Sequence, residues 1–457
     1  MFRLASFAFA ALVTLCPESP GAAHDSRLTT SVSRLASRVP GPASADVQAL
    51  IAAARGAPPM LCALAAHSVG NGGWGWSDAP VTPLPHADRR SARADSIAPA
   101  DVQFLLDNLG GGDACVTEIA VRLLASDDSG PAVDGLIRNL ASPDSSVRVA
   151  VSFGLGLAAP DRADDALLRA VDDRAASVRA NVVWALGRIG DGRAVRPATG
   201  ALRDGSPMVR QAAAGTLGQL DSASAVPALI RVLQDDDVAR VRRTAAWALG
   251  QLEAKAAAQA LAAALRSDAD AEVREMSAWA LGNIEARPET AALVAAAKGD
   301  SDDSVRETAV WALGNGGDES AADALGQILS TDRNPRVRNT AAWALGQFDL
   351  RTAPKGLIDA LGDGDRGLRT KAAWALGEIG DAAALPAIRA AMNRETDARA
   401  RKAELRALIR SGGGAAELTE LLKSKDAGIR EAAVRGLAGQ DGMDPWPWPM
   451  PRPRPFP

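Results

Sequence analysis

The chain has 457 residues, of which 47% are hydrophobic, 4% aromatic and 23% charged, and its formal net charge is −4 at pH 7. This charge is close to neutral for the length, so it gives no electrostatic reason to expect a nucleic acid or an anionic membrane as partner. The length suits about three ordinary domains or one array of repeats.

The N-terminus, MFRLASFAFAALVTLCPESPGAAHDS, is organised like a secretory signal peptide. Arg3 precedes an apolar run from Leu4 to Cys16, and the small residues Gly21 and Ala23 suit a cut after Ala23. We therefore expect residues 1–23 to be a signal peptide and residues 24–43 a flexible segment. The protein is expected to be exported to the periplasm or the extracellular space. No later apolar run approaches the ~20 residues of a transmembrane helix.

Residues 44–128 are predicted to form N-terminal helical repeats around a Gly/Pro-rich loop at 70–97. Cys62 and Cys115 lie in the two helical parts of this region. In an oxidising compartment they can form a disulfide. Each can instead be a small buried apolar residue, because neighbouring helices ~8–10 Å apart are distant for a bridge. The sequence leaves both possibilities open.

From residue 129 to residue 438 the chain repeats itself every 31 or 32 residues. A Val-Arg pair, or a close variant, marks most units: Val147-Arg148, Val178-Arg179, Val209-Arg210, Val241-Arg242, Val273-Arg274, Val305-Arg306, Val337-Arg338, Leu368-Arg369 and Ile429-Arg430. A glycine follows most of these marks nine residues later: Gly187, Gly218, Gly250, Gly282, Gly314, Gly346 and Gly377. About ten units of this kind indicate a repeat architecture.

Each unit holds two helical patterns that are separated by an Asp-rich turn. The first is short, as in AVPALIRVL (225–233), and the second runs through VRxxAAWALG. The acidic turn favours the N-terminus of the second helix. One pair of short helices cannot bury both apolar faces, whereas a stack of pairs can. The sequence therefore predicts an all-α protein, an α-solenoid (superhelix) of about 10–12 helix pairs.

Units such as DSASAVPALIRVLQDDDVARVRRTAAWALGQL resemble HEAT repeats, and in particular the PBS-lyase HEAT-like repeats. The resemblance rests on the VRxxAAxALG core. It implies an armadillo-like helical fold and is typical of protein-binding scaffolds. Phycobilin lyase subunits and deoxyhypusine hydroxylases also belong to this family, so the resemblance implies the fold more strongly than the function.

One bulky aromatic residue recurs six positions after the Val of most marks: Trp184, Trp247, Trp279, Trp311, Trp343 and Trp374. On a helical wheel this position lies ~145° from the centre of the apolar stripe. We expect these rings to face the concave side of the stack. One turn further on lie the expected neighbours of the rings, Arg188, Gln251, Asn283, Asn315, Gln347 and Glu378.

Two interpretations of the tryptophans remain open. An exposed apolar row marks a partner site, and the W-x-x-x-N spacing of Trp279 and Asn283 resembles the inner ladder of armadillo repeats, which implies peptide binding. Gly215 and the residues that replace Asn elsewhere depart from that pattern. Alternatively, the rings fill the space between adjacent second helices. The arginine of each mark is expected to pair with aspartates of the turns and to bridge repeats.

The chain lacks the sequence patterns of common catalytic centres. Its three histidines are His24, His67 and His86, and it contains no HExxH, CxxC or GxSxG motif. The segment GNGGWG (70–75) matches a dinucleotide-binding motif formally, but no strand precedes it and no helix follows. We therefore expect no enzyme, no cofactor and no metal, and an exported scaffold that binds a protein or extended peptide in a Trp-lined groove. The alternatives are a lyase-like protein, an accessory of a membrane metallopeptidase sensor, and a structural spacer.

Residues 439–457 form a Pro/Trp/Arg-rich tail that ends DPWPWPMPRPRPFP. Proline at every second position favours an extended polyproline-II conformation. Three roles stay open for this tail: a ligand for an aromatic-groove domain, a contact with a membrane interface, or a solvated terminus.

Overall fold

The computed structural model describes residues 44–58, 62, 97–127, 130–412, 414–424 and 427–438. The expected signal peptide, the segment 24–43, residues 70–96 of the expected loop and the tail 439–457 lie outside these ranges. Every regular element within the described residues is a helix. None of these helices combines the length and the apolar character that a membrane span requires.

The helices belong to two compact units, residues 1–216 and residues 217–457. The first unit contains α2 (Ser44–Ala54), α4 (Pro99–Asp107), α5 (Ala114–Ser126), α6 (Gly130–Asn139), α7 (Ser145–Ala158), α8 (Asp164–Ala170), α9 (Ala176–Ile189), α10 (Val195–Ala201) and most of α11 (Pro207–Gln219).

The second unit contains α12 (Val226–Asp235), α13 (Ala239–Gln251), α14 (Ala258–Ser267), α15 (Ala271–Asn283), α16 (Thr290–Gly299), α17 (Asp303–Gly316), α18 (Ala322–Thr331), α19 (Pro335–Gly346), α20 (Lys355–Ala360), α21 (Arg366–Ile379), α22 (Leu385–Arg394), α23 (Ala398–Arg410), α24 (Ala415–Leu421) and α25 (Ala427–Leu437). Short 3₁₀ turns precede many of the first helices, as at Ala223–Ala225 and Glu319–Ala321.

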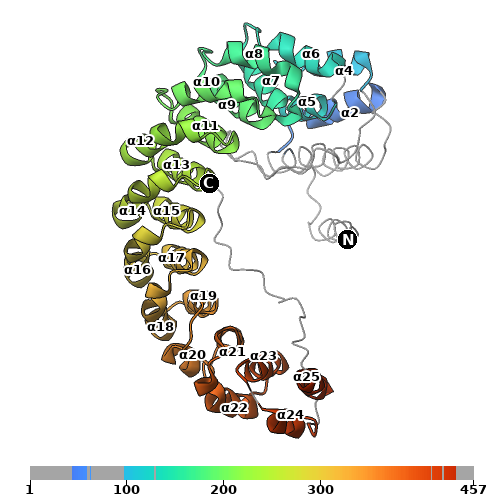
Figure 1. Cartoon of the computed structure of the whole chain (residues 1–457). Coiled ribbons are helices and arrows are strands. Elements are labelled where there is room, and N and C mark those ends of the chain that lie inside the picture. The colour runs from blue at the N-terminus through green and yellow to red at the C-terminus, as the bar shows by residue number, and fades with distance from the viewer. Residues whose placement is uncertain are drawn as a thin grey trace. The chain divides into compact units, whose positions relative to one another are not determined.

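Within each unit, consecutive helices form pairs that stack in chain order, which confirms the predicted α-solenoid. In the part of the chain that the structure describes, ten pairs follow one another in sequence from α6/α7 to α24/α25, and α4/α5 precedes them. In the second unit the first helices of the pairs form the outer row of a curved stack (Figure 1). The second helices α13, α15, α17, α19, α21 and α23 form the inner row (Figure 1).

The repeated apolar positions form a continuous core between the two rows. On α13, Val241, Ala245 and Leu249 have almost no contact with solvent, and on α12 Leu229 and Leu233 are equally buried. Removing such side chains from water is the main force that holds each pair together and joins it to the next.

The Asp-rich turns cap the second helices, as their sequence predicts. The side chain of Asp270 accepts hydrogen bonds from the backbone N–H groups of Glu272 and Val273 at 2.9 and 3.2 Å. Asp144, Asp302, Asp365 and Asp397 cap their helices in the same way. Each cap satisfies backbone donors that the helix itself leaves unpaired.

The arginine of most marks joins two repeats, which confirms the expected bridging role. In Arg274, Nε and Nη2 donate to the carboxylate of Asp300 in the next turn at 2.8 and 2.9 Å. Its Nη1 donates to the backbone carbonyl of Asp268 in its own turn at 2.9 Å. The Asp300 carboxylate also accepts from the backbone N–H of Asp302 at 2.9 Å. One guanidinium therefore fixes the relative position of two consecutive turns.

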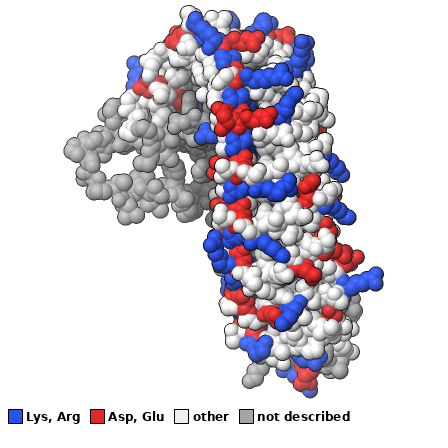
Figure 2. Space-filling view, turned by 90° about the vertical axis from the view of Figure 1, so that its left-hand side faces the viewer, with Lys and Arg blue, Asp and Glu red and all other residues white. Residues whose placement is uncertain are grey.

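We call these contacts the arginine ladder. Its rungs are Arg148–Asp173 and Arg179–Asp204 in the first unit, and Arg242–Asp268, Arg274–Asp300, Arg306–Asp332, Arg338–Asp363 and Arg369–Glu395 in the second. The hydrogen bond from Arg179 lowers the pKa of Asp204, and that from Arg369 lowers the pKa of Glu395. Figure 2 shows Lys and Arg alternating with Asp and Glu in a band along the stacked repeats on the face toward the viewer.

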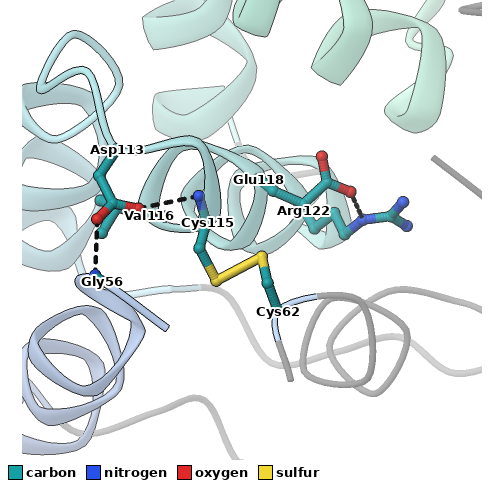
Figure 3. Close-up of a disulfide and its surroundings, with 7 residues drawn as sticks. All are labelled: Gly56, Cys62, Asp113, Cys115, Val116, Glu118 and Arg122. Atoms are coloured by element: carbon teal, nitrogen blue, oxygen red, sulfur yellow. Dashed lines mark hydrogen bonds and ion pairs between the residues drawn. A yellow bond between two sulfur atoms is a disulfide. The ribbon is translucent and has the colours of Figure 1, made fainter. Parts of the chain in front are cut away.

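The N-terminal end of the first unit is fastened to α5 by a covalent bond and a polar contact (Figure 3). Cys62 and Cys115 form a disulfide with Cα atoms 5.5 Å apart, closer than the axes of packed helices, so the open question resolves in favour of the bridge. Asp113 accepts from the backbone N–H of Gly56 at 2.8 Å while it caps α5. These hydrogen bonds, that of Gly56 foremost, hold the pKa of Asp113 below its usual value.

Candidate protein-binding surface

The tryptophans of the repeats are buried, so the expectation that their rings are exposed on the concave side is wrong. Between 3% and 9% of the surface of five of them is accessible: Trp184, Trp247, Trp279, Trp311 and Trp343. The sixth, Trp374 on α21, is half-buried. These residues are therefore packing residues of the stack, as the second interpretation of the sequence proposed.

Each ring fills a space beside the repeated glycine of the preceding pair. A Cβ atom built on Gly250 would lie 2.7 Å from Cζ3 of Trp279, and one built on Gly314 would lie 2.8 Å from Cζ3 of Trp343. The same glycine faces the alanine that follows the tryptophan, since the Cβ on Gly314 would also lie 2.8 Å from Cα of Ala344. Glycine, tryptophan and alanine together bring consecutive second helices into very close contact.

In the first unit this packing extends into a stack of aromatic and cationic groups. The rings of Phe153 on α7 and Trp184 on α9 stack with centroids 5.5 Å apart and an interplanar angle of 17°. The guanidinium of Arg122 lies 6.0 Å from the Phe153 centroid, and that of Arg188 lies 5.9 Å from the Trp184 centroid. Arg122 also pairs with the buried Glu118, whose pKa burial raises (Figure 3). Arg188 therefore serves packing rather than presenting a free cation.

The residues one turn beyond the tryptophans form a polar row that reaches solvent. Gln251, Asn315 and Gln347 are exposed, and Asn283 and Arg188 are half-buried. Some of them bind the preceding repeat: Asn315 Nδ2 donates to the Gly282 carbonyl at 3.1 Å and Arg188 Nε to the Gly156 carbonyl at 3.2 Å. We call Gln251, Asn283, Asn315 and Gln347 the amide row.

A second polar row lies one turn before the tryptophans, and its members are joined from repeat to repeat. Glu275 accepts from Thr308 Oγ1 at 3.3 Å, and Lys371 Nζ donates to Asn339 Oδ1 at 3.0 Å. Arg243 pairs with Glu272 of the next pair. Loss of hydration raises the pKa of Glu275 and lowers that of Lys371, because both lie half-buried on the inner row.

Helix α23 departs from the repeated pattern, and sequence reasoning missed it. Its mark is Ala400-Arg401, so Arg406 occupies the place of the tryptophan. Arg399, Lys402 and Arg410 lie on the same stripe, where Arg410 Nε donates to the Gly377 carbonyl at 3.1 Å. Counting one further period of 32 residues from Trp374 leads to Arg406 and could have found this stripe.

Sequence comparison agrees with this repeat geometry. A family model described as HEAT repeats matches residues 133–205, 195–282, 259–342, 290–366 and 322–409, which together cover more than half of the chain. The chain is a HEAT-repeat protein. No curated protein matches this HEAT-repeat chain.

Solved structures with a similar fold include two importin-type solenoids. A crystal structure of importin β has a TM-score of 0.58 and 14% identity, covering 90% of this chain and 64% of importin β. The second is Kap95p, whose binding is described as inducing the switch loops of RanGDP to adopt the GTP-bound conformation. It has a TM-score of 0.53 and 14% identity, and the match covers 95% of this chain and 66% of Kap95p. At this identity the likeness concerns the fold alone.

A phycocyanin lyase complex, CpcE with CpcF from Nostoc, is 27% identical over 54% of this chain and 94% of the matched one. Its TM-score of 0.31 is too low to support an argument about function. The described residues hold no group of three His, Cys, Asp or Glu side chains placed to bind a metal ion, and all three histidines lie outside them.

Proposed function

We propose that this HEAT-repeat protein is an exported, non-catalytic scaffold that binds a segment of another protein along the inner helices of the second unit. The observation that carries the proposal is the amide row, a set of Gln and Asn side chains at one position of consecutive inner helices, three of them exposed. A carboxamide offers both a donor and an acceptor, which is what the backbone of an extended peptide needs.

The spacing of the row suits such a ligand. Packed helices lie ~8–10 Å apart, and an extended chain advances ~3.3 Å per residue, so consecutive amides would meet about every third peptide group. Selectivity would come from the second polar row, where the ionisable side chains of Glu275 and Lys371 lie in a partly desolvated place. A charged side chain of the partner would gain more there than at an open surface.

Export is part of the proposal. The disulfide between Cys62 and Cys115 supports it, because such bonds persist mainly in oxidising compartments. The N-terminal signal-like segment supports it from the sequence. The likeness of the fold to Kap95p, which binds RanGDP, brings only the expectation that a stack of this kind can present a protein-binding surface.

A matched pair of triple variants tests the groove. Gln251→Ala/Asn283→Ala/Gln347→Ala removes amides from the inner row. Gln234→Ala/Gln259→Ala/Asn393→Ala removes three exposed amides from the outer helices α12, α14 and α22. Each tagged protein, with the wild type, would be used to recover partners from the exported fraction of its host after mild cross-linking.

We expect a discrete partner with the wild type and the outer variant, and a loss of at least about tenfold with the inner variant, since a few hydrogen bonds of ~1 kcal/mol each suffice for that factor. Equal recovery by all three proteins would contradict the groove and favour a structural spacer. Circular dichroism of each variant checks that the fold is intact.

A further inference from the structure

Helix α23 of the inner row carries four basic side chains in one stripe: Arg399, Lys402, Arg406 and Arg410. Their offsets of three, seven and eleven residues bring them within ~80° of arc on the helix. Arg399, Lys402 and Arg410 are exposed and Arg406 is half-buried. Such a stripe differs from the outer face, where charges of both signs alternate (Figure 2).

This stripe replaces packing groups rather than adding charges to a polar surface. In the five preceding inner helices of the second unit, the equivalent of Arg406 is a tryptophan that packs beside the repeated glycine. At α23 the glycine Gly377 instead faces Ala407, with a built Cβ 3.1 Å from its Cα. At this position of α23 a half-buried guanidinium therefore replaces the aromatic ring of the earlier repeats.

We propose that the basic stripe of α23 binds an acidic segment of a partner protein. The amide row occupies the first part of the inner row, and the stripe lies near the other end of the inner row. This inference deepens the proposed function and rests on it. The stripe is ~16 Å long, which corresponds to about five residues of an extended chain. Because side chains of an extended chain alternate, acidic residues at every second position would face the stripe together.

The surroundings of the stripe favour a narrow protein segment over a membrane or a nucleic acid. Glu378 on α21 pairs with Arg410 at 2.8 Å, and on α25 Glu431 pairs with Arg435, so both neighbouring inner helices carry carboxylates as well as cations. Further along the inner row, α15 presents Glu272 and Glu275. A long polyanion or a charged bilayer would meet these carboxylates and be repelled.

Two peptides of opposite charge serve as probes, fluorescein-labelled GSESESEG and GSKSKSKG. Binding to the full chain is measured by fluorescence anisotropy at low and at physiological ionic strength. The test variant is Arg399→Glu/Lys402→Glu, which changes two exposed residues. The control is Arg351→Glu/Lys355→Glu, which makes the same change of net charge at two exposed positions, one before the outer helix α20 and one at its first residue.

We expect the wild type to bind the acidic peptide, and the control to bind it within about twofold of the wild type. Reversing two charges on the stripe should weaken binding at least about tenfold, because each close charge pair at a surface contributes up to ~1 kcal/mol and reversal makes it repulsive. Binding should also weaken as salt screens the charges.

Three results would overturn the proposal. The first is that the wild type does not bind the acidic peptide at about 1 mM, a concentration that corresponds to a binding free energy of only ~4 kcal/mol. The second is an equal loss of binding in both variants, and the third is tighter binding of a DNA duplex or of phosphatidylserine vesicles than of the peptide. If partner recovery still depends on the amide row in any of these cases, the proposed function stands and the inference about α23 alone falls.

Discussion

Helix α17 contains two glycines whose replacement by alanine should change stability in opposite directions. Gly314 lies against the next inner helix: a Cβ built on it would lie 2.8 Å from Cα and Cβ of Ala344 and from Cζ3 of Trp343. Gly316, two residues later on the same helix, has no atom within 4 Å of its built Cβ. Neither residue has a positive φ.

The magnitude follows from the contact distances. Carbon atoms without a bond prefer ~3.5–4.0 Å, so the new methyl group at Gly314 would be about 1 Å too close to three atoms, one of them backbone. Overpacking of this kind costs about 1–3 kcal/mol, while Gly→Ala in a helix gains ~1 kcal/mol. We expect Gly314→Ala to lose about 1–2 kcal/mol and Gly316→Ala to be neutral or gain up to ~1 kcal/mol.

Urea unfolding followed by far-UV circular dichroism measures both variants against the wild type. The unfolding of a repeat array can depart from two-state behaviour, so the midpoint of the last transition is compared as well as the fitted free energy. A Gly314→Ala protein as stable as the Gly316→Ala protein would refute the close contact between consecutive inner helices, and with it the packing role of the tryptophans.

Three further predictions concern buried charges and the disulfide. Glu404 is fully buried, neither carboxylate oxygen has a hydrogen-bond partner, and burial raises its pKa to about 7 from 4.5. The folded state thus prefers the neutral acid, and stability falls as the pH rises from about 4.5 to about 7. Glu404→Gln should remove this loss, so the free energy of unfolding should rise by about 3 kcal/mol at pH 8 and stay unchanged at pH 4. An equal gain at both pH values would contradict the raised pKa of Glu404. Arg306→Ala should cost about 3–5 kcal/mol in urea unfolding, because the partner carboxylate stays buried without its cation, whereas the exposed Arg333→Ala should cost under ~0.5 kcal/mol. Cys115→Ser opens a loop of 53 residues to Cys62 and should lower the stability of the first unit by up to about 4 kcal/mol in calorimetry. An unchanged transition on reduction of the wild type would count against any stabilising role for the bridge.

Most of the architecture could be predicted because its signals are local and repeated. The Val-Arg marks locate the second helices, and Asp270 shows why acidic turns precede them, since its carboxylate caps α15. The pairing of Arg274 with Asp300 also follows from the sequence, because the period brings each arginine beside the turn of the next repeat. Repetition supplies the tertiary neighbours that a single helix cannot reveal.

The direction of the tryptophans could not be decided from one helical wheel. A position ~145° from the core of its own pair can face the open side of the stack or the second helix of the neighbouring pair. The rings of Trp279 and Trp311 face the second helix of the preceding pair. The deciding signal was present in Gly250 and Gly282, since a residue without a Cβ leaves room for the ring of the next repeat. The wheel describes one helix, whereas burial depends on two.

The same seam explains where a binding surface can arise. From α13 to α21 the glycine, the tryptophan and the arginine ladder fix the distance between consecutive inner helices, so the amide row is presented at a constant spacing. Helix α23 departs from this pattern at two positions: Arg406 stands where a ring would pack, and Glu404 stands where the inner helices from α13 to α21 bury alanine or serine. Both changes place a charged side chain where the earlier inner helices pack an apolar or small one. Elsewhere the sequence keeps its core pattern, so a departure from it indicates a requirement other than packing. An acidic ligand on the exposed side of α23 would be such a requirement, because it would bring further carboxylates beside these four neighbouring cations.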